Sequence, residues 1–285
     1  MKSQALYASA VFFIASLFST SCTKKQEITT NNISFDTISV ARVYHLNNDS
    51  TQPSCNLKIN FVYPLSYNND KEALHHVQKT FISLFFDDYY TDMTPAEAVE
   101  KYTVNYIDNY KEDARIFFKE KDNDRSEDAS MDNYFSYYET LSNKITLNKA
   151  NLVAFQIIQT NYKGGTNSYK QLKNHVLNLE TGRLLTEEDI FDTGYEKVLN
   201  AIFKDRLKSE NKVNNLHDLE DLGYFGIEEI MPNNNFLVDE KGITYVFNKN
   251  EYSVIQLPEI NIFIPFNELS LVLKTESPIS AFSQK

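Results

Sequence analysis

Residues 134–162, YFSYYETLSNKITLNKANLVAFQIIQTNY, decide the fold class of this chain. Apolar and polar residues alternate along this stretch on both sides of Lys149 and Ala150, which is the period of a β-strand with one buried face. Two such runs joined by a short connection form an antiparallel pair. The stretch therefore predicts a β-hairpin with long arms, over 134–148 and 150–162.

Two strands and two helices are expected upstream of this hairpin. Apolar residues alternate over 35–46 and over 55–64, and the turn-forming residues NNDSTQPS between them predict another antiparallel pair. Asp70 stands before apolar residues at spacings of three and four, the pattern of an amphipathic helix. Thr94 is followed by a proline and, at the third helical position, by Glu97, which together make a capping box.

The remainder of the chain also contains strands and helices in blocks. The expected elements are strands at 173–180, 235–239, 242–248 and 259–264, and helices at 186–191, 194–210 and 265–273. Because strands and helices do not alternate strictly, the pattern predicts an α+β fold with antiparallel sheets and helices packed on them. The segment KGGTNSYKQ separates two linked α+β modules, which we place at 35–162 and 163–285.

The first residues have the features of a bacterial secretion signal. Lys2 precedes a mostly apolar run that is too short to span a bilayer. Small residues then lead directly to Cys22, as in the signal of a lipoprotein, whose cysteine receives a diacylglyceryl group. The alternative is an ordinary signal peptide followed by a chance cysteine. We assign 1–21 to the signal peptide and 22–34 to a polar, lipidated tether.

Acylation of Cys22 makes the lipid bilayer the first expected partner, since two acyl chains give stable anchoring without a spanning helix. The expected location is the bacterial cell envelope, either facing the periplasm or exposed on the outer membrane. Cys55 would then be the only free thiol. Its place in an alternating run favours a buried structural cysteine over a nucleophile.

The charge of the chain argues against nucleic acid as a partner. The formal net charge is −11; removal of residues 1–21 takes away one lysine and leaves 27 basic against 39 acidic residues, or −12. Such a polyanion repels phosphate backbones and anionic lipid headgroups. It suits a basic protein ligand, although a negative net charge commonly serves solubility alone.

Motifs of catalysis and metal binding are missing from the sequence. There is no H-E-x-x-H, G-x-S-x-G, P-loop or G-x-G-x-x-G. Asp122, Asp124 and Ser126 have the spacing of the first ligands of an EF-hand loop. That loop needs Gly and Glu where this chain has Glu127 and Asn133. We therefore expect no metal, no cofactor and no enzyme activity.

Three consecutive carboxylates invite an acid–base interpretation. Glu187, Glu188 and Asp189 follow Thr186 at the start of a predicted helix. The first turn of a helix favours negative charge because the helix dipole is positive there. We therefore prefer a helix-capping role for this cluster.

Several segments of the C-terminal half resemble a known family. Residues 162–167, YKGGTN, are similar to a Y-x-G-G-A-H motif. The stretches VLNLETGRLLTEEDIF (176–191), NNNFLVDEKGITYVFN (233–248) and NIFIPFNELSLVL (261–273) follow in the same order. Together they resemble the extracytoplasmic domain family of unknown function shared by the anti-sigma factor RsiV and the peptidoglycan deacetylase PdaC. This resemblance implies a preceding α+β module over 35–160.

The chain departs from the family pattern at two places. The A-H pair of the motif is Thr166 and Asn167 here, and of the family's Y-E-I-A-P-Y stretch only Glu251 stands in register. The sequence also lacks a deacetylase domain and a cytoplasmic sigma-binding segment. The resemblance therefore implies the extracytoplasmic module alone.

These observations predict a monomeric lipoprotein with a non-catalytic module that binds an envelope glycan or a protein such as a lysozyme. Adjacent glycines predict backbone with positive φ, or a close approach of another group. The candidate ligand-binding residues are Tyr162, Gly164, Gly165, Thr166, Asn167 and Glu251.

One alternative is a peptidoglycan-modifying enzyme, for which Asn167, His175 and Glu251 would have to meet in one cleft. Another is a structural envelope lipoprotein without a small ligand.

Overall fold

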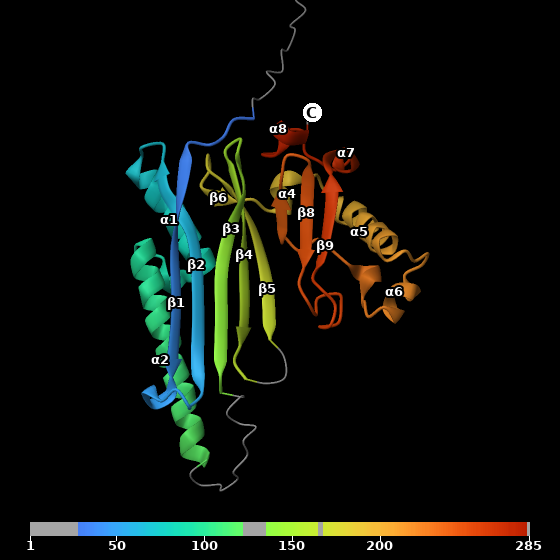
Figure 1. The fold of residues 1–285 in the computed structure, drawn as a ribbon. Coiled ribbons are helices and arrows are strands. Elements are labelled where there is room, and N and C mark those ends of the chain that lie inside the picture. The colour runs from blue at the N-terminus through green and yellow to red at the C-terminus, as the bar shows by residue number, and fades with distance from the viewer. Residues whose placement is uncertain (1–27, 122–134, 165–167, 284–285) are drawn as a thin grey trace, which may run out of the picture.

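A computed structural model describes residues 28–121, 135–164 and 168–283 of the chain. It has an α+β fold with two β-sheets, which confirms the predicted fold class. Figure 1 shows the larger sheet beside the smaller one, with β5 at the boundary. The larger sheet has the order β1 (Ile33–His45), β2 (Ser54–Tyr67), β3 (Tyr137–Lys149), β4 (Leu152–Tyr162), β5 (Tyr169–Asn178), β6 (Arg183–Leu184). The smaller sheet has the order β7 (Phe236–Val238), β8 (Gly242–Phe247), β9 (Ile260–Pro265).

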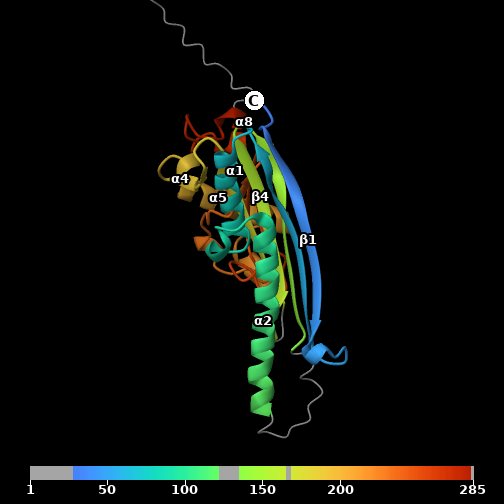
Figure 2. The same ribbon diagram turned by 90° about the vertical axis from the view of Figure 1, so that its left-hand side faces the viewer.

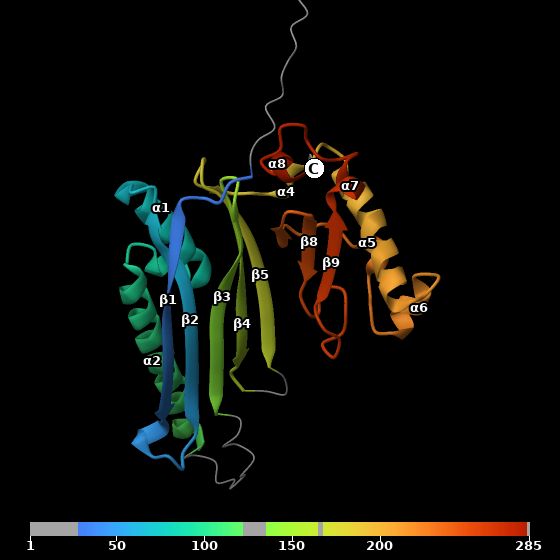
Figure 3. The same ribbon diagram turned by 45° about the horizontal axis from the view of Figure 1, so that its top comes forward.

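The helices cover the two sheets from different sides. Figure 2 shows α1 and α2 along one face of the large sheet, and Figure 3 shows α5 beyond the small sheet, on the side away from β5. The α-helices are α1 (Lys71–Phe85), α2 (Pro95–Lys121), α4 (Glu187–Ile190), α5 (Tyr195–Asn211), α6 (His217–Asp221), α7 (Phe266–Leu269) and α8 (Ser280–Ser283). Short 3-10 turns lie at Leu46–Asn48, Asp88–Tyr90 and Ile227–Glu229. No helix in the described ranges is both long and apolar enough to span a membrane.

The predicted strand pairs and helix starts are confirmed. β1 pairs antiparallel with β2, and β3 with β4, through a turn in which Ala150 and Asn151 have φ of 51° and 60°. The Asp70 side chain accepts hydrogen bonds from the first turn of α1. Thr94 and Glu97 form the reciprocal bonds of a capping box, with 2.9 Å from Thr94 N to Glu97 Oε2.

One strand pair corrects the expectation of wholly antiparallel sheets. β2 and β3 run parallel, from Cys55 opposite Tyr137 to Asn60 opposite Ser142. The chain between them contains α1 and α2, which cross one face of the sheet and return the chain to the end where β2 began. A helical crossover gives a parallel pair, whereas a hairpin gives an antiparallel one.

Two hydrophobic cores share the strands β4 and β5. One core lies between the large sheet and the helices α1 and α2, where the rings of Phe81 and Phe155 stack 4.3 Å apart. The other fills the space between β4, β5, the small sheet and α5. Neighbouring residues serve different cores, since Leu177 belongs to the first and Val176 to the second. The predicted module boundary at 162/163 thus falls inside a continuous sheet, in the β4–β5 connection.

Two predicted segments have different limits in the structure. The helix expected over 265–273 ends at Leu269, because the following chain bonds back to the end of α4: Asp192 N donates to Val272 O at 2.8 Å. The tether expected over 22–34 is shorter, because β1 already begins at Ile33. Asn31 is fixed before it, with its side chain donating to Leu152 O at 2.8 Å and accepting from Asn151 N at 2.7 Å.

Candidate functional site

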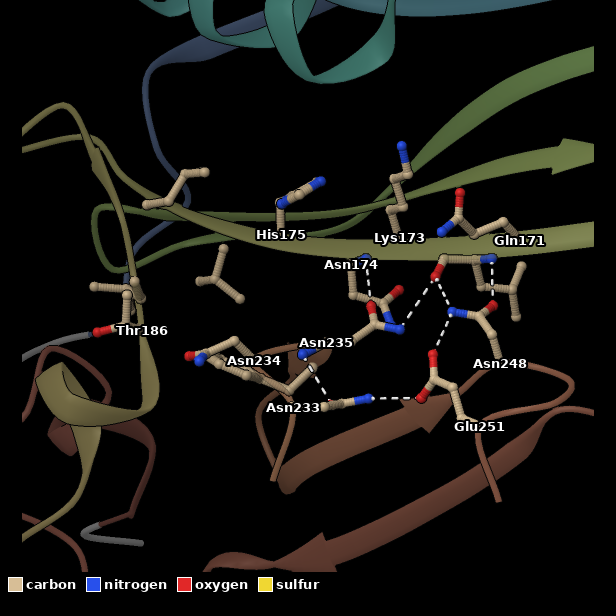
Figure 4. A pocket seen from close by; sticks show the side chains of 15 residues that line it. Gln171, Lys173, Asn174, His175, Thr186, Asn233, Asn234, Asn235, Asn248 and Glu251 are labelled. Carbon is tan, nitrogen blue, oxygen red and sulfur yellow. Dashed lines mark hydrogen bonds between the residues drawn. The ribbon is translucent and has the colours of Figure 1, made fainter. Parts of the chain in front are cut away.

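A cleft of about 480 Å³ lies between the edge of β5 and two loops of the small sheet. Figure 4 shows β5 above the cleft and the strands of the small sheet below it. Of the fifteen residues that line it, six carry amides, five are apolar and one is a carboxylate. They are Gln171, Leu172, Lys173, Asn174, His175, Val176, Leu184, Leu185, Thr186, Asn233, Asn234, Asn235, Phe236, Asn248 and Glu251.

Asparagine side chains of the small sheet close the edge of β5. Asn248 accepts from Leu172 N at 2.7 Å and donates to Leu172 O at 3.1 Å. Asn235 accepts from Asn174 N at 2.8 Å and also donates to Leu172 O at 3.1 Å. An amide presents a donor and an acceptor side by side, as a backbone peptide does. These side chains therefore take the place of a neighbouring strand and join the two sheets.

Glu251 stands at the end of this amide network. Its carboxylate accepts from Asn233 Nδ2 at 3.2 Å and from Asn248 Nδ2 at 3.4 Å (Figure 4). Its side chain is exposed to solvent. Acceptor capacity therefore remains for a ligand, since a carboxylate offers about four lone-pair sites. The structure places this predicted site residue in the cleft.

Asn174 contributes the least satisfied group of the cleft. The residue is 3% exposed, and its Oδ1 accepts from Gln156 Nε2 at 2.9 Å. Its Nδ2 has no hydrogen-bond partner among the described residues. A buried donor without a partner costs about 1–3 kcal/mol. An acceptor placed beside this nitrogen would relieve that cost.

Tyr162 and Gly164 lie at the far end of β4 and do not line the cleft. The Tyr162 ring stacks on that of Tyr138 at 6.0 Å. Gly164 has φ of +87°, which confirms that this position needs a positive φ. The other predicted members of this loop, Gly165, Thr166 and Asn167, lie outside the described residues.

His175 and Glu251 border the same cleft but do not meet. Figure 4 shows them on opposite sides of β5. The His175 ring lies 5.4 Å from that of Phe155, in the core under α1. Burial, together with nearby Lys173, lowers the pKa of His175 to about 4. The ring is thus a neutral core group near neutral pH, and the geometry offers no acid–base pair.

The carboxylate cluster before α4 has divided roles. Asp189 completes the capping box with Thr186, as expected. Glu187 instead is buried, and accepts from Asn234 N at 2.7 Å and from Tyr195 OH at 3.3 Å. Burial raises the pKa of this carboxyl. Glu187 therefore fixes the loop that carries the cleft asparagines.

The cleft asparagines were missed by the sequence analysis. The run of three asparagines at 233–235, directly before a predicted strand, was the available signal. The β5 partners of Asn235 and Asn248 lie 61 to 76 residues away, so no local pattern marked these contacts. Across 28–121, 135–164 and 168–283, no three His, Cys, Asp or Glu side chains gather as a metal site.

Comparisons with known proteins find similar sequences and folds of unknown function. Residues 188–267 match a family described as a protein of unknown function, DUF3298. A crystal structure of a DUF3298 family member from Bacteroides fragilis is similar, with 29% identity, a TM-score of 0.82, and coverage of 90% of this chain and 99% of that chain. A DUF3298 family protein from Pseudomonas aeruginosa shares the fold at 10% identity, with a TM-score of 0.55 and coverage of 85% and 96%. No curated protein matches the sequence.

The matched residues contain most of the small-sheet side of the cleft, from Asn233 to Glu251. The comparisons support the expectation that the C-terminal half carries a domain of unknown function. The finer link to the domains of RsiV and PdaC stays a prediction.

Proposed function

We propose that this chain is a lipid-anchored, non-catalytic binding module of the bacterial cell envelope, and that its cleft binds an envelope glycan. The observation that carries the proposal is the buried Asn174 Nδ2, a donor without a partner among the described residues, in a cleft whose lining includes six amides. Such a lining suits a ligand rich in hydroxyl and acetamido groups, because amides both donate to and accept from them.

The chemistry of the cleft suggests how an acetamido sugar would bind. A ligand carbonyl can accept from Asn174 Nδ2, which relieves the cost of that buried donor. A ligand hydroxyl or amide N–H can donate to the Glu251 carboxylate, which adds a charge-assisted hydrogen bond. Asn235 and Asn248 are held in place by their bonds to β5, which lowers the entropic cost of binding.

The absence of catalysis in this proposal rests on the arrangement of the ionisable groups that line the cleft. His175 is held in the core on the other side of β5 from Glu251. General acid–base catalysis needs both groups within hydrogen-bond reach of the same reacting atoms. The alternative hypothesis of an enzyme would need Asn167 or another group, in place of His175, to act together with Glu251.

Glycan binding is tested with the soluble chain from residue 23, titrated with muropeptides in a calorimeter. We expect saturable binding that falls at least tenfold in Asn174→Leu and in Glu251→Gln, with Asn60→Ala as a control on the open face of the large sheet. Melting curves show whether each variant is folded. Absence of binding to any muropeptide by the folded wild type would reject the glycan, and capture of a lysozyme instead would assign a protein ligand.

The Gly-Gly loop is tested separately with Thr166→Ala combined with Asn167→Ala, which keeps both glycines. A fall in muropeptide affinity at unchanged melting temperature would extend the site to this loop. Unchanged affinity would confine the site to the cleft.

The lipid anchor is tested by Cys22→Ala in the full chain. We expect the variant to lose membrane association and fatty-acid labelling, because Cys22 is the acylation site of the signal. A variant that still fractionates with membranes and takes up label would refute the lipoprotein assignment.

A further inference from the structure

β1 is the outer strand of the large sheet, and its far edge pairs with no other strand in the described part of the chain. Thr37 lies opposite Val62 in the β1–β2 ladder. The N–H and the C=O of Val62 both form hydrogen bonds with the Asn143 side chain of β3, and not with Thr37. The backbone groups of Thr37, and of every second residue along β1, therefore point to the open edge. Such an edge is a template for another strand.

Two charged side chains of β1 occupy backbone groups along this edge. Asp36 Oδ1 accepts from Thr37 N at 2.7 Å, and Arg42 Nη1 donates to Ala41 O at 3.1 Å. Both side chains are exposed, and neither forms a salt bridge within the described residues. They act as local substitutes for a missing strand. A partner that supplied the backbone bonds would release one positive and one negative charge.

The side chains of β1 that face the helices form a self-complementary row. The row reads Asp36, Ile38, Val40 and Arg42, and its two central residues are half-buried at the rim of the core. When a second β1 lies antiparallel beside the first with Ser39 opposite Ser39, Asp36 lies opposite Arg42, and Ile38 lies opposite Val40. A charged pair at each end and β-branched pairs in the middle are favourable cross-strand contacts.

We propose that β1 pairs antiparallel with β1 of a second copy of this chain, in the register that places Ser39 on the two-fold axis. In this register Thr37 N–H donates to Ala41 O of the second copy. Those are the groups that Asp36 and Arg42 occupy in the single chain, and the freed charges then pair across the interface. The interface is isologous, as in most homodimers, and it would replace the expectation of a monomer.

The pairing also fixes how two anchored copies would lie. Antiparallel strands place the two N-termini at opposite ends of β1, which has 13 residues and a length of about 43 Å. If both copies carry the proposed anchor in one membrane, the paired strands lie along the bilayer.

Cysteine cross-linking in cells that express the full chain tests the register. The two copies of Ser39→Cys would face each other with Cα atoms about 5.5 Å apart, within disulfide range. The control is Val43→Cys, which is 60% exposed but would lie about 27 Å from its copy. We expect oxidation to give a disulfide dimer at position 39 at least tenfold more than at 43. Equal yields at both positions would overturn the proposal.

Charge reversal tests the contacts without relying on a disulfide. Arg42→Asp replaces two opposite-charge pairs by two like-charge pairs and should weaken the dimer about tenfold in light scattering of the detergent-solubilised chain. Adding Asp36→Arg should restore wild-type dimerisation, because the pairs are then reversed in sign. A wild-type chain that stays monomeric at every concentration tested, or a double variant no better than Arg42→Asp, would also overturn the proposal.

Discussion

The large sheet ends in β1 on one side and in β5, with the two-residue β6, on the other, and the backbone groups at these two ends have opposite surroundings. At β5 the backbone groups are closed by amides that reach across from the small sheet, with Asn235 and Asn248 in the place of a strand. At β1 they are covered only by the strand's own charged residues, Asp36 and Arg42. The closed edge is buried and joins two cores, whereas the open edge faces solvent.

The difference shows what decides the behaviour of an edge strand. Amides that arrive from another sheet are held by packing, so their hydrogen bonds are buried and costly to remove. Charged side chains that bond to their own strand at the exposed edge are solvated, so their hydrogen bonds can be displaced at little cost. The first edge therefore contributes to stability and to the cleft, and the second is available to a partner.

Opening the closed edge should have the largest effect. Asn235→Ala combined with Asn248→Ala leaves Leu172 N, Leu172 O and Asn174 N without these partners. Each buried backbone group left unpaired costs about 1–3 kcal/mol, so we expect a loss of roughly 5 kcal/mol in the free energy of unfolding. Urea denaturation measures this loss, with Asn60→Ala as the control. A loss under about 1 kcal/mol would show that the amides are not essential.

The pH dependence that the buried His175 of β5 gives to stability should come next in size. Burial of His175 lowers its pKa from 6.5 to about 4, so the folded state binds this proton more weakly than the unfolded chain does. Its contribution to stability is complete above pH 6.5 and is lost as the pH falls toward 4, by up to about 3 kcal/mol. His175→Gln should remove this part of the acid destabilisation. Equal pH profiles of the two proteins would contradict it.

A smaller effect is expected where the chain enters β1. Asn31→Ala removes the side-chain bonds to Asn148, Asn151 and Leu152, at a cost of about 1–2 kcal/mol because the site is only partly buried. Hydrogen exchange should then show faster exchange at Ala150 N, whose acceptor is Thr29 O. Unchanged protection there would mean that other contacts hold this segment.

Substitutions at the open edge should hardly change the free energy of unfolding of a single chain. Arg42→Gln should change the free energy of unfolding of the monomer by less than about 0.5 kcal/mol, because the side chain is exposed and bonds only its own strand. Thermal unfolding at low protein concentration measures this. A large loss would place Arg42 in the fold and remove the contrast between the two edges.

Local features of the sequence were sufficient for most elements. Alternation over 134–162 predicted the β3–β4 hairpin, and the capping residues Asp70 and Thr94 marked the helix starts. Each of these signals lies within a few residues of the structure it predicts. The parallel pairing of β2 with β3 had no such signal, because strand order depends on how α1 and α2 pack.

The candidate site was predictable only in part for the same reason. Glu251 was found through a family resemblance, and it does line the cleft. Asn174, Asn235 and Asn248 act through partners far along the chain, so their sequence neighbourhoods resemble ordinary strand ends. The enzyme alternative required the His175 side chain to face a cleft. Which face of β5 carries this side chain depends on how the strand packs against the two cores, and the sequence did not define those cores.

The attachment of residues 28–31 to the β3–β4 turn limits how far the molecule can reach. If Cys22 is lipidated, the connection to the docked Ile28 is only five residues, 23–27, which span at most about 18 Å. The rigid β1 strand is more than twice that length. The protein would therefore behave as a rigid domain on a short tether. Its ligand would have to come within about the length of that domain from the membrane.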